Sequence, residues 1–211
     1  MSVNIKDHIM MIDAEKAAEQ QRNMSLHRGF LSLEMMGVLA IIAVAIVLSV
    51  GAVSGMFNKN TINDEISNVQ MLVTQSRGML KTQGEYPFTS AAKMTGTLVQ
   101  FGGAPGNMTI NGDKSSGNAK IANGWGGDVI VSPEKVQGST NNKGFSITYK
   151  NVPQEACTMI VTKLSGSAMI HEMNISGTNN IGAISAEKAG TQCKADNGSV
   201  GINTLIFKSN S

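Results

Sequence analysis

The chain has 211 residues, which is enough for one domain of ordinary size and an additional segment. Hydrophobic residues make up 41% of it and allow a packed core, whereas a net charge of +2 is too weak to indicate a nucleic-acid partner. The histidines lie far apart in the sequence, and His171-Glu172 lacks the second histidine of a zinc-protease motif. We therefore expect no metal, no cofactor and no catalytic site.

Residues 1–29 are polar and carry four basic and four acidic side chains. They lack the apolar stretch of a conventional signal peptide, so they are not a standard secretory leader. Two interpretations of this stretch stay open on composition alone: a leader of another kind, or a cytoplasmic tail.

A long apolar segment follows the polar stretch. The 22 residues from Met35 to Met56 are uncharged, and as a helix they measure about 33 Å at ~1.5 Å per residue, which matches a bilayer core of roughly 30 Å. Basic residues before the segment, Arg22 and Arg28 among them, predict that the preceding end stays in the cytoplasm. We therefore expect residues 30–57 to cross the membrane and the rest of the chain to face an oxidising compartment.

The helical pattern continues beyond the length that a membrane needs. Gly84 supplies a stop signal, so the sequence predicts one helix of about fifty residues that begins at Phe30. Its second half, residues 58–84, is amphipathic, with polar residues such as Asn68 on the intervening faces. The apolar stripe follows the i, i+4, i+7, i+11 spacing of a helix and consists of Ile62, Ile66, Val69 and Val73.

Residues 85–211 form the expected globular domain. Glycine is frequent between residues 100 and 144, which predicts loops there, with a turn that leads into a strand at residues 124–132. Residues 144–152 alternate between apolar and polar side chains as in a half-exposed strand, and a short helix follows, with Pro153 at its first position. Further strands are expected at residues 168–175 and 202–208. Because helices and strands are segregated along the chain, the pattern favours an α+β fold with an antiparallel sheet.

Two cysteines, Cys157 and Cys193, lie beyond the apolar segment with 35 residues between them. In an oxidising compartment two cysteines most simply form a disulfide, whereas two free buried thiols are the alternative. Closing that loop would contribute up to ~4 kcal/mol in the chain-entropy account of disulfides.

The junction between the polar and apolar stretches reads RGFLSLEMMGVLAII. Gly29 has no side chain to clash with a protease, and Phe30 begins the apolar run. Glu34 places a single carboxylate inside that run, where an unpaired charge is costly and marks a functional site by default. Cleavage after Gly29 would create an amine on Phe30, which is an available partner for Glu34.

This combination resembles the signal of type IV prepilins: a basic residue and glycine, an apolar first residue, glutamate at the fifth position, and about twenty further apolar residues. The resemblance implies cleavage after Gly29 by a prepilin peptidase and N-methylation of Phe30. It also implies that Glu34 of one subunit pairs with the Phe30 amine of a neighbour as the subunits form a helical homopolymer.

The resemblance extends to a location and to partners. The precursor would lie in the bacterial inner membrane with its leader in the cytoplasm, before the subunit enters an extracellular filament. The implied partners are an assembly platform protein, an assembly ATPase and an outer-membrane secretin. The implied activity is structural, without an enzymatic reaction.

Within the family, the long leader, the GWGG start of a strand and the PQEAC start of a helix resemble the type IVb pilins. In that group a cysteine pair staples a large C-terminal region to the sheet, as Cys157 and Cys193 would here. Phe30 departs from the pattern, because phenylalanine at the first mature position is more usual in the type IVa group.

Two alternatives have different functions. A type II secretion pseudopilin shares the junction but builds a short periplasmic piston. An uncleaved single-span membrane protein with a periplasmic ligand-binding domain would keep residues 1–29. Adhesion, aggregation and conjugative contact are all open as roles of a filament, as is the choice between a major and a minor pilin.

Overall fold

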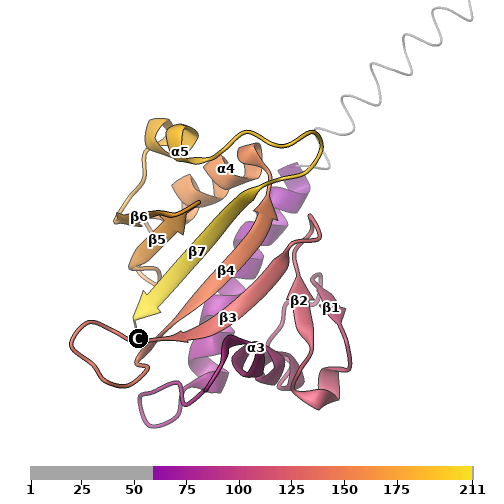
Figure 1. The fold of residues 1–211 in the computed structure, drawn as a ribbon, viewed down its shortest axis with the longest axis vertical. Coiled ribbons are helices and arrows are strands. Elements are labelled where there is room, and N and C mark those ends of the chain that lie inside the picture. Colours follow the sequence, from indigo (N-terminus) through magenta and orange to yellow (C-terminus); the bar gives the residue numbers. More distant parts are fainter. Residues whose placement is uncertain (1–58, 211) are drawn as a thin grey trace, which may run out of the picture. The chain divides into compact units, whose positions relative to one another are not determined.

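The structure is a computed structural model, and it describes residues 59–210 (Figure 1). The polar stretch of residues 1–29, the apolar segment 30–57 and the site residues Gly29, Phe30 and Glu34 lie outside the described residues. Within residues 59–210, no helix has both the length and the apolar character that crossing a membrane requires.

The described part begins with a helix over residues 59–80. Ile62, Val69 and Val73 of the expected apolar stripe are each at most 2% exposed, and Ile66 packs against the same core. Asn68 differs from the expectation, because it is buried and not on a solvated face. The amphipathic pattern of this helix is therefore confirmed, with one polar residue assigned to the wrong face.

The helix ends at residue 80, four residues before the expected stop at Gly84. Thr82 and Glu85 exchange two backbone hydrogen bonds of 2.8 and 3.0 Å across a tight turn. Gln83 and Gly84 occupy the left-handed region at φ values of 51° and 86°. The glycine thus marks the turn after the helix and not its last residue, because a two-residue turn of this kind needs positive φ.

Seven strands form one antiparallel sheet in the order β1-β2-β3-β4-β7-β5-β6. The C-terminal strand β7 therefore lies in the interior of the sheet, between β4 and β5 (Figure 1). The strands are β1 (Thr109–Asn111), β2 (Lys120–Ala122), β3 (Asp128–Glu134), β4 (Gly144–Val152), β5 (Glu172–Ile175), β6 (Thr178–Ile181) and β7 (Asn203–Asn210). An α+β fold with an antiparallel sheet is confirmed.

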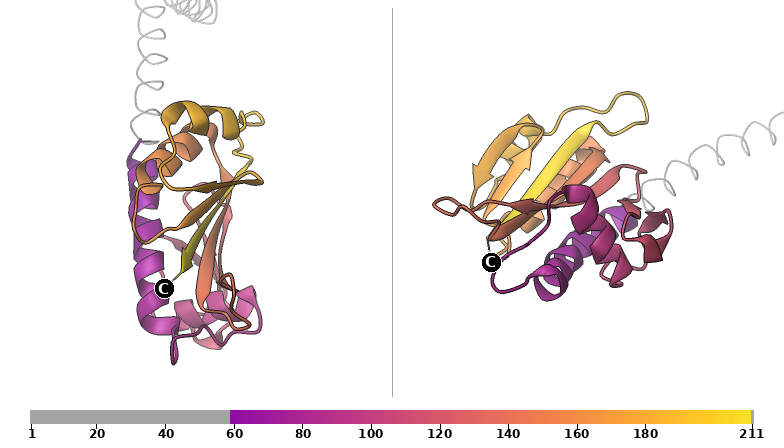
Figure 2. Two further views of the ribbon diagram at one scale, coloured as in Figure 1. Left: turned by 90° about the vertical axis from the view of Figure 1, so that its left-hand side faces the viewer. Right: turned by 60° about the horizontal axis from the view of Figure 1, so that its bottom comes forward.

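Helices cover one face of this sheet, and the other face is open (Figure 2). Alternate residues of the strands point to the covered face, where Ile147, Tyr149, Leu205 and Phe207 are at most 1% exposed. The remaining helical elements are α3 (Ala91–Gln100), the short 3-10 helix η1 (Lys114–Ser116), α4 (Gln154–Leu164) and α5 (Ala186–Gln192).

Several of these elements were expected, and others were not. β4 has the bounds that the alternation predicts, and α4 follows it with Pro153 as its N-cap, one position before the expected place. α3, α5, β1, β2 and β6 were not predicted. The expectation of loops between residues 100 and 144 is wrong where β1, β2 and η1 lie, because tertiary pairing orders these short polar segments.

The helix α3 completes the sheet where β2 ends. Thr95 Oγ1 accepts a hydrogen bond of 2.9 Å from Val131 N and donates one of 3.1 Å to Val131 O. Without Thr95, the backbone N–H and C=O of Val131 would lie unpaired at the edge of β3. Gly96 is required at this crossing, since a Cβ there would come within 2.1 Å of Gly117 O.

Candidate functional site

Among the expected site residues, the structure places Cys157 and Cys193 and brings them together. Their sulfur atoms form a disulfide across a Cα–Cα distance of 5.9 Å, which excludes the alternative of two free thiols. Cys157 lies in the first half of α4, and Cys193 caps the end of α5. The bond therefore joins α5 to α4, and α4 packs against β7.

A polar network surrounds the disulfide and holds the following loop, residues 194–202. Asp196 accepts a hydrogen bond of 2.8 Å from Gln154 N, so a loop carboxylate caps the start of α4, where Pro153 supplies no side-chain cap. A negative charge is favourable at that end of a helix. Gln154 Nε2 also donates to Cys193 O at 3.2 Å.

Asn203 anchors the same loop at its other end, and its side chain is completely buried. Its amide donates to Val152 O at 3.1 Å and to Lys194 O at 2.9 Å. Its carbonyl accepts hydrogen bonds from Lys194 N at 2.7 Å and from Ser176 Oγ at 3.0 Å. Every donor and acceptor of the Asn203 side chain thus has a partner, so burying this side chain leaves no polar group unpaired.

A second polar contact joins the helix of residues 59–80 to the loop between β2 and β3, and the sequence reasoning missed it. We call this the helix–loop contact; it consists of Glu65, Asn68, Tyr149 and residues 123–127. Glu65 is 3% exposed, and its carboxylate accepts hydrogen bonds from Gly124 N at 2.6 Å and from Asn68 Nδ2 at 3.2 Å. None of the groups that shift its pKa is a cation.

Burial raises the pKa of the Glu65 carboxyl above its ordinary value, and the nearby Asp64 carboxylate adds to this effect. The hydrogen bonds from Gly124 and Asn68 offset the rise only in part. Burial also raises the pKa of Tyr149, with a further contribution from the negative charge of Glu65. The Tyr149 hydroxyl faces this carboxylate, but it has no hydrogen-bond partner of good geometry among the described residues.

The loop of residues 123–127 is shaped by Asn123 and by glycines. Asn123 Oδ1 accepts hydrogen bonds from Trp125 N at 3.1 Å and Gly127 N at 2.9 Å, while its Nδ2 donates to Lys150 O at 2.8 Å. A Cβ on Gly127 would lie 1.9 Å from Lys150 O, so no larger residue fits without a backbone shift. Close packing therefore requires Gly127 of the GWGG motif, whereas Gly126 has open space around it and a φ of 75° that favours glycine.

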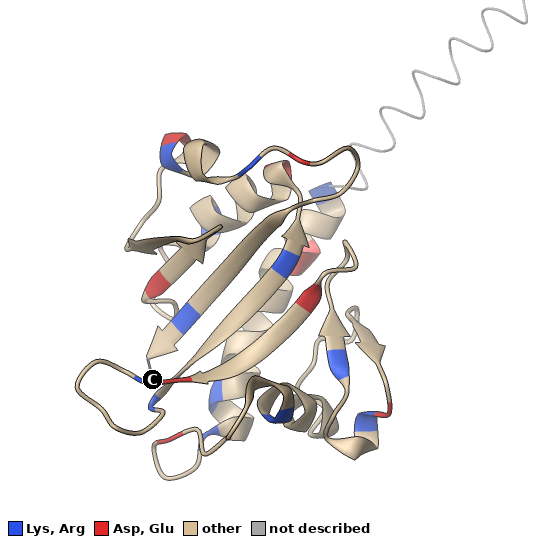
Figure 3. Cartoon of the chain, viewed as in Figure 1, with Lys and Arg blue, Asp and Glu red and all other residues tan. Residues whose placement is uncertain are grey.

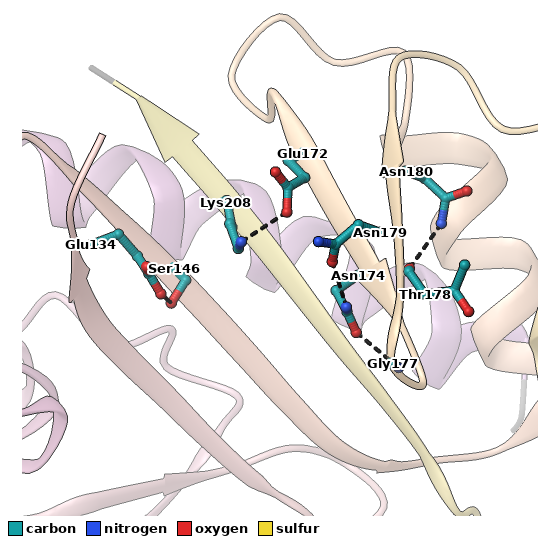
Figure 4. Close-up of polar contacts among 9 residues, drawn as sticks. All are labelled: Glu134, Ser146, Glu172, Asn174, Gly177, Thr178, Asn179, Asn180 and Lys208. Atoms are coloured by element: carbon teal, nitrogen blue, oxygen red, sulfur yellow. Dashed lines mark hydrogen bonds and ion pairs between the residues drawn. The ribbon is translucent and has the colours of Figure 1, made fainter. Parts of the chain in front are cut away.

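Few residues along the strands of the sheet carry a charge (Figure 3). Lys208 of β7 forms an ion pair of 2.7 Å with Glu172 of β5, and on β4 Ser146 Oγ donates to Glu134 at 2.8 Å (Figure 4). A polar hollow of about 400 Å³ lies beside the ion pair. A more apolar groove of about 320 Å³ lies between α3, β2 and β3.

No group of three His, Cys, Asp or Glu side chains in residues 59–210 is arranged to hold a metal ion. The polar contacts described above fix helices and loops in place.

Comparisons with a family model and with solved structures identify the same group of proteins. The family model described as PilS N terminal matches residues 59–210. The crystal structure of a type IVb pilin from Salmonella typhi is 45% identical, with a TM-score of 0.63 over 71% of this chain and 99% of that chain. The NMR structure of the type IVb pilin PilS from Salmonella typhi is 44% identical, with a TM-score of 0.50 over 71% and 96% of the two chains. A search of curated protein sequences finds no match.

Proposed function

The chain belongs to the PilS family of type IVb pilins, and from this premise we propose that it is a precursor of the major structural subunit of a type IV pilus. The observation that carries the proposal is the 45% identity to a type IVb pilin over 99% of that protein's chain. Phenylalanine at the first mature position is more usual in type IVa pilins, but the presence of Phe30 does not alter this assignment.

The proposed processing step is cleavage of the Gly29–Phe30 peptide bond by a prepilin peptidase, followed by methylation of the new amine. The anchored precursor has no amine on Phe30, whereas the mature subunit does. Glu34 of a neighbouring subunit would then accept this cation as its partner within the apolar bundle. Since both charges lose water, the pair serves to select the register of the helices and adds little net stability.

The driving force for assembly would come from the apolar segment. Bundling residues 35–56 with neighbouring copies keeps apolar surface out of water, at roughly 25 cal/mol for each Å². The helix of residues 59–80 supports the arrangement, because its exposed stripe beyond Asp64 is uncharged and so does not repel a neighbour. That stripe consists of Ser67, Gln70, Met71, Thr74, Gly78 and Met79.

The test compares Glu34→Ala with the matched control Glu187→Ala, which removes an exposed carboxylate from α5. We expect the Glu34 variant to be folded and cleaved but to yield few surface filaments by electron microscopy, whereas the control assembles normally. Normal filament yield from Glu34→Ala would refute the assigned role of this residue. Absence of the chain from filaments in the unmodified strain would refute the pilin proposal itself.

A type II secretion pseudopilin is the second candidate, because it shares the junction. The family membership and the disulfide-closed C-terminal region favour the pilin. Long surface filaments that contain the chain, as seen by immunogold labelling, would decide between the two.

A further inference from the structure

Three Asn-Gly pairs occur in the described part: Asn111–Gly112, Asn123–Gly124 and Asn197–Gly198. Asparagine followed by glycine is prone to deamidation, since glycine lets its backbone nitrogen approach the preceding side chain without a steric clash. The structure treats the three pairs differently, so their shared sequence does not imply a shared reactivity.

Asn123–Gly124 is locked at every atom that the reaction uses. The Asn123 side chain is 3% exposed and is held by hydrogen bonds to Trp125, Gly127 and Lys150. The attacking atom would be Gly124 N, and its hydrogen is already donated to Glu65 at 2.6 Å. Freeing this pair requires that the helix–loop contact open.

Asn197–Gly198 has none of these restraints. Both residues are exposed, and the Asn197 side chain makes no hydrogen bond within residues 59–210. Its backbone exchanges hydrogen bonds of 3.0 and 3.2 Å with Val200, in a tight turn in which Gly198 has a φ of 64°. A local turn of this kind opens without disturbing the core, and local openings of exposed loops cost little free energy.

Asn111–Gly112 lies between these extremes. Asn111 is exposed, but it ends β1 and is paired with Lys120 of β2. We expect the sheet to restrain its backbone and to slow the reaction relative to Asn197.

We propose that Asn197 is a site of spontaneous deamidation, which slowly adds a negative charge to the loop of residues 194–202 that follows the disulfide. After Gly198 N loses its proton to solvent, it attacks Asn197 Cγ, the new C–N bond closes a succinimide ring, and ammonia leaves with a proton. Water then opens the ring at either carbonyl and gives aspartate or isoaspartate. The only co-reactant is water, and no oxidation or reduction occurs.

The position of the new carboxylate gives the reaction a structural consequence. It appears next to Asp196, whose carboxylate caps α4 through Gln154 N. The aspartate product places a second negative charge near this helix end, whereas isoaspartate lengthens the main chain and disrupts the turn with Val200. The exposed loop thus changes charge and shape with the age of the protein.

The experiment uses the full chain, either in filaments or purified in detergent, and follows its peptides by mass spectrometry during storage. We expect Asn197 to deamidate at least about tenfold faster than Asn123, because only Asn123 depends on opening of the packed structure. The rate at Asn197 should rise from mildly acidic to mildly alkaline buffer, and isoaspartate should be detectable there. Equal rates at the two positions, or a faster rate at Asn123, would overturn the proposal.

One variant and one unfolded sample give the test its controls. Asn197→Gln should abolish the fast deamidation and leave the fold unchanged, since the exposed side chain makes no hydrogen bond within residues 59–210. Unfolding the chain in urea should bring the rates at Asn123 and Asn197 together, because both then depend on the Asn-Gly pair alone. A tenfold difference that persists in urea would show that the fold is not its cause and would contradict the account.

Discussion

Two loops of the domain, residues 123–127 and residues 194–202, are held by opposite means. The first has no covalent restraint and is fixed by glycines, by Asn123 and by the buried carboxylate of Glu65. The second is exposed over most of its length and is fixed by the disulfide, by Asn203 and by the hydrogen bond from Gln154 N to Asp196. The comparison teaches that packing and hydrogen bonds can hold a loop along its length, whereas the restraints on the second loop leave residues 197–200 open to solvent and to chemistry.

The largest effect should come from removing the covalent restraint. The double variant Cys157→Ser, Cys193→Ser should lose up to ~4 kcal/mol of unfolding free energy, because the open chain regains the entropy of a loop with 35 intervening residues. Urea unfolding of the variant and of the parent, each with and without reductant, measures this. Reductant should destabilise the parent alone; an effect on both would point to a different cause.

The next largest effect should come from Asn203→Ala, which should lower the free energy of unfolding by about 2–3 kcal/mol. It leaves the buried Val152 O and the part-buried Lys194 N without their partner, and it releases one end of the second loop. Hydrogen exchange should increase in residues 194–202 and stay unchanged in residues 123–127. Asn179→Ala, at an exposed position of β6, is the control and should have a small effect, since it removes only an exposed hydrogen bond from Asn174.

Gly127→Ala should cost about 1–3 kcal/mol, because the added methyl overlaps Lys150 O and the chain must shift to accept it. Gly106→Ala is the matched control, since nothing lies within 4 Å of the added methyl there. Thermal unfolding of both variants measures the difference. Equal stabilities would mean that the first loop is not packed as described.

The smallest effect is a pH dependence that belongs to the first loop. Since the pKa of Glu65 is raised in the folded chain, its contribution to stability is fully present below the unfolded pKa and is lost as pH rises through the higher folded pKa. Glu65→Gln should therefore flatten stability against pH between acidic and neutral conditions, as measured by urea unfolding. The exposed Glu155→Gln should leave the slope as it is, and an unchanged slope in the Glu65 variant would contradict the assignment.

Sequence patterns predicted the parts of the fold that local periodicity controls. The stripe of the helix over residues 59–80 and the alternation of β4 follow from spacing alone. α3 escaped prediction because its centre, Thr95 and Gly96, has low helix propensity; both residues serve contacts with distant segments. The short strands β1 and β2 exist only because each pairs with another strand.

The candidate site divides in the same way. The disulfide was predictable, because the compartment and the number of cysteines restrict the choices. The helix–loop contact was not, because Glu65 and Gly124 are 59 residues apart and nothing local marks a glutamate as buried. One signal for the burial of Glu65 was available in the sequence: it lies one turn before Val69, on the same face of the helix as the apolar stripe.

The proposed processing step can be checked by mutation as well as by direct analysis. Gly29→Leu should block cleavage, because the leucine side chain would clash with the peptidase at a position where glycine has no side chain. The variant should then keep residues 1–29 and stay out of filaments. If the variant instead yields a mature chain that lacks residues 1–29 and has the same mass as the mature parent chain, this requirement is contradicted.

The most direct test of the account is the intact mass and N-terminal sequence of the chain in purified surface filaments. We predict a subunit that begins at methylated Phe30, contains the Cys157–Cys193 disulfide and lacks residues 1–29. Absence of the chain from the filaments, with a chain in the membrane fraction that still begins at Met1, would contradict it and would indicate an uncleaved single-span membrane protein.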